Sequence, residues 1–204
     1  MLRLCRPWAL AVAVACIVPT AFVAGEPTAE ASTAIALSFD DLVTMSDVVV
    51  VATAKSRTAR WEGGRIVSYT TAIVDESVGA GPKVGDAVVV RTLGGVVGDV
   101  GQKVFGEAVL PIGKQAVLFL RTLPPAIAAS AEPTSKSVTG MEQGVMHVAL
   151  GTDKVARIAE SALTLNLVPP VSPKGVPAHV AAAGRPVKDV LVELRTLWTT
   201  HGKK

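Results

Sequence analysis

Apolar runs along the chain predict a small β-rich domain. The strongest strand signals are Ala87–Leu93 and Ala116–Arg121, which flank a stretch punctuated by glycines. Two earlier β-branched runs, Val48–Arg57 and Ile66–Val78, are separated by a turn at Trp61–Arg65. The two glycines of that turn can adopt positive φ, so the earlier runs are expected to pair as a hairpin.

A short helix is predicted just before the first strand. Ser38 is a suitable N-cap, and the pair Asp40–Asp41 falls in the first turn, where the helix dipole favours negative charge. The buried face of this helix is expected to comprise Leu42, Val43 and Met45.

A second helix is predicted at the end of the chain, over residues 186–201. Pro186 suits the first turn of a helix. An apolar stripe with helical spacing follows, and it consists of Val187, Val190, Leu191, Leu194 and Leu197. This stripe is expected either to cap the β domain or to recruit a partner.

The order of these elements favours an all-β domain over residues 38–160. A last hairpin is expected from Val145–Leu150 and Lys154–Ile158, which gives five to six strands with turn-rich connections. Such a pattern is typical of a barrel or a sandwich. Leu123–Gly140 is expected to be irregular and mobile at the surface, and residues 161–185 to form a proline-rich linker or wrapping arm.

The N-terminus has the pattern of a secretory signal peptide. Arg3 and Arg6 precede the apolar run Pro7–Ala24, and small residues follow it. We therefore expect a signal peptide over residues 1–25, a flexible lead-in over 26–37, and a periplasmic, cell-surface or secreted protein. An uncleaved membrane anchor is the competing interpretation, although the run is short for a span and contains a proline.

Both cysteines, Cys5 and Cys16, lie in the expected signal peptide. The sequence around Cys16 resembles a lipobox, the site where bacterial lipoproteins are cleaved and acylated. Ala13 stands where a larger aliphatic residue is usual, and the chain stays apolar after Cys16, so this interpretation is disfavoured. Removal of the signal beyond Cys16 would leave no thiol for a disulfide or for nucleophilic catalysis.

The order of the central segments resembles the netrin/TIMP-like OB-fold domains. The matching segments are Asp47–Val51, Tyr69–Val74, Val88–Thr92 and Gly113–Leu120. The chain is also similar to a group of uncharacterised exported bacterial proteins that carry Gly-Gly-Xaa-Xaa-Gly after the third strand, here Gly94–Gly98.

The resemblance covers residues 38–122 and implies a small OB-like (TIMP-like) β-barrel, closed or partly open. Together with the two helices predicted above, this gives a mainly β fold with a short N-terminal helix and a C-terminal amphipathic helix. TIMP inhibitors chelate zinc through an N-terminal cysteine. The region after the expected signal peptide has no cysteine, so that mechanism cannot be transferred.

Composition and motifs exclude several classes of chemistry. The formal charge of +3 is scattered and only 4% of the residues are aromatic, so nucleic-acid binding is not expected. The spacing of the glycines over Gly94–Gly101 fits no phosphate-binding loop, and they are interpreted as a connection or a bulged strand. His147, His179 and His201 are far apart in sequence, without a zinc or triad motif. We expect no cofactor and no metal.

The aromatic residues that remain as candidate partner-binding residues are Trp61, in a turn, and Trp198, near the C-terminus; both are expected to be exposed. The leading hypothesis is an exported, non-enzymatic β-barrel module that binds a protein or another extracellular ligand. Contact with a membrane is expected only through an uncleaved signal segment. The alternative is an accessory or inhibitor domain for an extracellular protease. A third hypothesis is an enzyme whose site carries no recognised motif.

Overall fold

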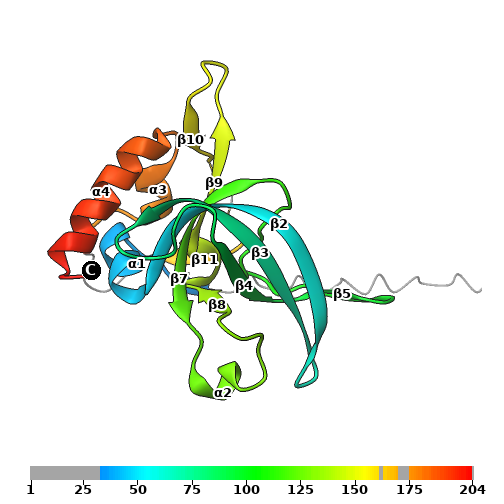
Figure 1. Ribbon diagram of the computed structural model, residues 1–204. Coiled ribbons are helices and arrows are strands. Elements are labelled where there is room, and N and C mark those ends of the chain that lie inside the picture. Colours follow the sequence, from blue (N-terminus) through cyan, green and yellow to red (C-terminus); the bar gives the residue numbers. More distant parts are fainter. Residues whose placement is uncertain (1–32, 161–162, 170–174, 204) are drawn as a thin grey trace, which may run out of the picture. The chain divides into compact units, whose positions relative to one another are not determined.

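A computed structural model describes residues 33–160, 163–169 and 175–203. The expected signal peptide and Cys16 lie outside the described residues. The described residues are mainly β, with 43% in strands and 21% in helices. Its elements (Figure 1) are β1 (Thr33–Ile35), α1 (Phe39–Met45), β2 (Val48–Glu62), β3 (Arg65–Val78), β4 (Ala87–Leu93), β5 (Gly95–Val97), β6 (Val100–Gln102), β7 (Gln115–Thr122), α2 (Pro125–Ala128), β8 (Lys136–Val138), the 3-10 turn Met141–Gly144, β9 (Val145–Leu150), β10 (Ala156–Ile158), β11 (Asn166–Val168), α3 (Ala178–Ala182) and α4 (Val187–Thr200).

Five strands close into a barrel in the order β2-β3-β4-β8-β7, and β7 returns to pair with β2. All of these pairings are antiparallel except that between β4 and β8. The first three strands are consecutive, whereas the last two close the ring in reversed order. This Greek-key arrangement makes the domain an OB-like barrel and not a sandwich.

The barrel is closed by a strand that the sequence does not reveal. The prediction that Leu123–Gly140 is entirely irregular and mobile is wrong, because β8 lies within it and pairs with both β4 and β7. A strand of three residues is too short to show a period of two. Its position is determined by the two strands beside it, which is tertiary context and not local propensity.

Small side chains fill the barrel interior. Alternate residues of all five strands point inward, and they include Val50, Ala72, Val90, Leu118 and Val138. Valine and alanine suit a five-stranded barrel because its interior is narrow and must be filled to the density of a protein core.

Helices cover one part of the barrel's outer surface. The outward residues Val49 and Val51 of β2 and Val117 and Phe119 of β7 pack in one buried cluster with residues of α1, α3 and α4. Figure 1 shows α1 and α4 together on this side of the barrel. The predicted stripe of α4 therefore packs on the barrel.

The short helix α1 begins where predicted, with a capping box between Ser38 and Asp41. Its buried residues are Phe39, Leu42 and Val43. The prediction that Met45 contributes to this face is wrong, because Met45 is exposed. Residues 39, 42 and 43 share a face by the i, i+3, i+4 rule, and position 45 points away from it.

The prediction that Trp198 is exposed is also wrong, since only 5% of this residue is accessible. Trp198 continues the apolar face of α4 and packs against Gly79, where an added Cβ would lie 2.2 Å from the indole Nε1. Lys203 lies over the same ring, with Nζ 5.0 Å from the ring centroid, and donates to the carbonyl oxygens of Val43 and Thr44 at 2.8 and 3.0 Å. Trp198 is a core residue.

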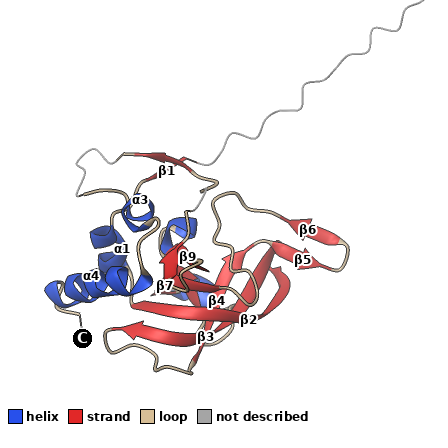
Figure 2. Cartoon of the chain, turned by 90° about the horizontal axis from the view of Figure 1, so that it is seen from above, coloured by secondary structure: helices blue, strands red, loops and turns tan. Residues whose placement is uncertain are grey.

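Three smaller features lie outside the barrel. The glycine segment Gly94–Gly101 is neither a plain connection nor a bulged strand, because it contains most of the two-stranded hairpin β5–β6 (Figure 2). The hairpin β9–β10 forms as predicted and extends the sheet from β7.

The segments predicted as lead-in and linker contribute β1 and β11, which pair in parallel, and α3. Within the described residues, no helix has the length and apolar character needed to cross a membrane.

Candidate ligand-binding cleft

A cleft of about 410 Å³ lies on the outer face of β3 and β4, and none of its lining residues belongs to α1, α3 or α4. One wall is the β2–β3 turn and the other is the segment that leads from β7 into α2; in Figure 1 these two segments extend from the same end of the barrel. We call this space the arginine cleft. Its apolar lining includes Val67, Leu93, Leu123, Pro124, Ile127 and Met141, and its charged lining comprises Glu62, Arg65, Arg91, Glu107 and Arg121.

Strand register places several polar side chains of the cleft face in one row. Tyr69 pairs with Arg91, Arg91 with Ser137, and Ser137 with Arg121, across β3, β4, β8 and β7. Directly paired residues point to the same side of a sheet. Their sequence neighbours Val90 and Val138 point into the barrel, so the row lies on its outside.

A buried carboxylate organises the arginines of the cleft. Glu62 Oε2 accepts from Arg91 Nη2 at 2.9 Å and Nε at 3.2 Å, and Glu62 Oε1 accepts from Arg60 Nε at 2.8 Å and from the Tyr69 hydroxyl. The side chains of Glu62 and Arg91 are only 7% and 12% exposed. Burial alone would raise the pKa of Glu62, but the hydrogen bonds from Tyr69, Arg91 and Arg60 outweigh it and hold that pKa below its usual value. Glu62 is therefore charged and fixed.

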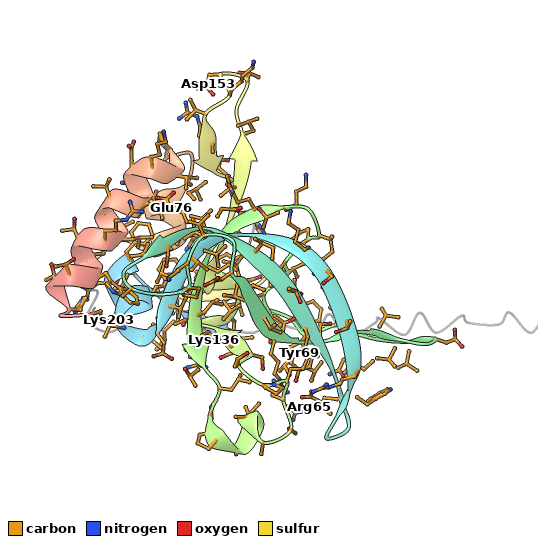
Figure 3. The ribbon with its side chains drawn as sticks, viewed as in Figure 1. Arg65, Tyr69, Glu76, Lys136, Asp153 and Lys203 are labelled. Carbon is orange, nitrogen blue, oxygen red and sulfur yellow. The ribbon has the colours of Figure 1, made fainter. Side chains whose placement is uncertain are left out.

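Tyr69 and Arg60 connect β3 and β2 to residues 130–132, which follow α2. The Arg60 guanidinium lies 4.6 Å from the centroid of the Tyr69 ring and donates to the Ser130 carbonyl oxygen at 3.2 Å. The backbone N–H of Glu132 donates to the Tyr69 hydroxyl at 3.2 Å. Figure 3 shows Tyr69 and Arg65 towards the end of the barrel that carries the β2–β3 turn. These contacts fix the segment after α2 against the β2–β3 hairpin.

Two cationic groups of the cleft are available to a ligand. Arg65 and Arg121 are exposed, and neither side chain has a hydrogen bond or an ion pair among the described residues. Glu107 differs, because its carboxylate accepts from the backbone N–H groups of Leu93 and Ala108 at 3.1 and 3.0 Å. Burial raises the pKa of Glu107 in spite of these bonds.

A second cavity of about 410 Å³ lies at the mouth of the barrel beside β5–β6. Its polar groups are largely occupied within the chain. Ser68 Oγ donates to the Gly94 carbonyl oxygen at 2.7 Å, Arg57 donates to Thr70 and to the Leu110 carbonyl oxygen, and Glu142 accepts from Thr164 and from the Leu165 N–H. Because these polar groups already have partners within the chain, we take the arginine cleft as the candidate site.

The pair of His201 and Asp40 does not have the geometry of a catalytic relay. His201 Nε2 lies 2.8 Å from Asp40 Oδ1 and 3.3 Å from Thr44 Oγ1, so both partners meet the same ring nitrogen. A relay of the triad type needs one partner on each nitrogen. Among the described residues, no group of three or more His, Cys, Asp or Glu side chains is placed to hold a metal ion.

The two tryptophans predicted to bind a partner are not brought together. Trp61 is 51% exposed, as predicted, but it lies on β2 opposite Ile66 and lines neither cavity. Trp198 is buried. The cleft residues Arg91 and Arg121 were missed, although each stands out as a charged residue in or just after an apolar run. Their convergence depends on β8, which has no signal in the sequence.

No known protein family matches the chain, and no curated protein matches it. The likeness to netrin/TIMP-like domains accordingly stays a prediction. The OB-like barrel is established by its own strand order.

Proposed function

We propose that this protein is an exported, non-enzymatic interaction module that binds a polypeptide partner in the arginine cleft. One observation carries the proposal. The cleft on the outer face of β3 and β4 combines an apolar lining with Arg65 and Arg121, which have no hydrogen bond or ion pair among the described residues. Grooves on this side of OB barrels, beside the loops that flank it, are a common place for ligands.

The composition of the cleft favours a polypeptide over a nucleic acid. Sites for single-stranded nucleic acid rely on aromatic side chains on which bases stack. The lining of the arginine cleft includes leucine, isoleucine, methionine, proline and arginine but no aromatic residue. Methionine and arginine are enriched in protein–protein interfaces, and arginine is common among the residues that dominate their affinity.

The fixed geometry of the cleft also supports binding. Tyr69 and Arg60 hold residues 130–132, which follow α2, against β2 and β3. A site that is already ordered loses little conformational entropy when a partner binds, so more of the contact energy appears as affinity.

Site-specific photo-crosslinking tests this proposal. The full chain would carry benzoylphenylalanine in place of Ile127, an exposed residue of the cleft, or in place of Val192, an exposed residue of α4. We expect a discrete crosslinked polypeptide from the envelope or culture fraction of the source cells with the probe at 127 and none at 192. Equal labelling from both positions, or none from 127, would contradict the proposal. A crosslinked protease would favour the accessory or inhibitor role.

A further inference from the structure

We infer that Arg91, Ser137 and Arg121 form an oxyanion subsite within the arginine cleft. The subsite takes a carboxylate, or the chemically similar phosphate or sulfate, on the bound partner. This inference rests on the proposed function in that it takes the cleft as the binding site. It goes further by naming the chemical group that the cleft recognises.

The first argument is the register of three neighbouring strands. Arg91 of β4 and Arg121 of β7 both pair directly with Ser137 of β8, and all three residues line the cleft. Adjacent strands are about 4.8 Å apart, so the two arginine backbones are separated by roughly 10 Å with a small residue between them. Two long guanidinium side chains on either side of a serine can reach one anion above it.

The second argument is the hydroxyl group in the middle of the row. Ser137 Oγ is buried and has no hydrogen-bond partner among the described residues. Buried hydroxyls in proteins are nearly always hydrogen-bonded. Arg121, which pairs directly with Ser137, is an exposed residue of the same row. An oxyanion supplies the acceptor that the serine lacks.

The third argument is the orientation of Arg91. Glu62 accepts from Nε and Nη2 of this arginine, whereas Nη1 has no hydrogen-bond partner among the described residues. Because Arg91 Nη1 is not fully buried, it is accessible to a ligand. Glu62 acts as a positioning residue, because it fixes the guanidinium and leaves its other N–H groups for a ligand. Guanidinium groups held in this way bind oxyanions with strong, directional hydrogen bonds.

The fourth argument is the charge around the row. Three arginines and two glutamates line the cleft. Glu62 is paired with Arg91 and Arg60, and the Glu107 carboxylate is occupied by two backbone N–H groups. With three arginines against two glutamates, the lining keeps an excess of one positive charge, which an anionic partner would neutralise.

An NMR titration of the isotopically labelled full chain tests the subsite. N-acetylglutamate, inorganic phosphate and sulfate would be added separately at constant ionic strength, and the shifts of Arg91, Ser137 and Arg121 followed. We expect saturable shifts at these positions. Arg121→Gln should weaken anion binding about tenfold, which is the scale of losing one charge-assisted contact. The control Arg157→Gln removes the same charge from β10, outside the cleft, and should leave the affinity unchanged.

The anions distinguish the source of the group. Tightest binding of N-acetylglutamate indicates an acidic side chain of a polypeptide, and tightest binding of phosphate or sulfate indicates a phosphorylated or sulfated partner; each supports the subsite. Shifts that do not saturate, or equal weakening by Arg121→Gln and Arg157→Gln, overturn it. If the partner still crosslinks from position 127 in Arg121→Gln, and the wild-type protein binds none of the anions, only the subsite is overturned. Saturable anion binding without a crosslinked partner overturns only the proposed function.

Discussion

The outer surface of this barrel has two regions with different residues at equivalent positions. Where β2 and β7 face α1 and α4, the outward residues are apolar, among them Val49, Val51 and Phe119. Where β3, β4 and β8 line the arginine cleft, the outward row is Tyr69, Arg91 and Ser137. Inside the barrel, one apolar cluster spans both regions. The outward positions therefore distinguish the surface that packs against α1 and α4 from the surface that carries the arginine cleft.

The largest effect is expected in the covered region. Leu194 of α4 is fully buried in the cluster between the helices and the barrel. Leu194→Ala should lower the free energy of unfolding by about 3 kcal/mol, because it removes buried apolar contacts and leaves a cavity. Urea denaturation measures this change. Val192→Ala, on the exposed side of the same helix, should change the stability by less than about 0.5 kcal/mol. Similar losses in both variants would contradict the packing of α4 on the barrel.

A smaller loss is expected from the buried carboxylate of the cleft. Glu62→Gln keeps the shape of the side chain but leaves Arg91 and Arg60 without their charged partner, which should cost about 2 kcal/mol at neutral pH. The folded-state pKa of Glu62 is depressed, so its stabilisation is present above the usual value of 4.5 and is lost as the pH falls through the folded-state pKa. The stability difference between wild type and Glu62→Gln should shrink accordingly in urea denaturation at stepwise lower pH. A difference independent of pH would show that the charge of Glu62 is not the cause.

Two serines whose hydroxyl groups are buried should give opposite effects on stability when they are replaced by alanine. Ser46, at the end of α1, hydrogen-bonds with the Leu42 carbonyl oxygen at 2.6 Å and with Thr139 Oγ1 at 2.9 Å. Ser46→Ala should destabilise the protein by about 1–2 kcal/mol, whereas Ser137→Ala should be neutral or stabilise it by up to about 1 kcal/mol, because Ser137 Oγ has no partner among the described residues. Thermal unfolding followed by circular dichroism compares the two. A clear loss of stability in Ser137→Ala would contradict an unpaired hydroxyl in the cleft.

The smallest effect is expected at Trp61. Its side chain is half exposed and lines neither cavity, so Trp61→Ala should change the stability by about 1 kcal/mol or less and leave partner binding intact. Partner binding by the purified variant, measured by surface plasmon resonance once the partner is identified, checks this. Loss of binding with preserved folding would show that the partner also uses the other face of the β2–β3 hairpin.

The sequence predicts most of the covered region and little of the cleft. Long runs such as those of β2, β3 and β7 show strand composition directly, and the stripe of α4 has a helical period, so their apolar faces could be anticipated. Trp198 was misjudged because its position near the chain end concealed that it continues the buried stripe. The cleft depends on β8, whose three residues carry no period, and on a row of side chains contributed by four strands. Only the strand register brings Arg91, Ser137 and Arg121 together.

The most direct test of the central claim is a binding comparison of two exposed apolar positions, one in each region. Ile127→Asp places a charge in the arginine cleft, and Val192→Asp places the same charge on the outer side of α4. Both variants would be measured as full chains against the crosslinked partner, with unfolding curves to confirm that each is folded. If the partner binds in the arginine cleft, the affinity of Ile127→Asp should fall at least about tenfold, whereas Val192→Asp should bind with the affinity of the wild type. Equal binding by both variants would contradict it.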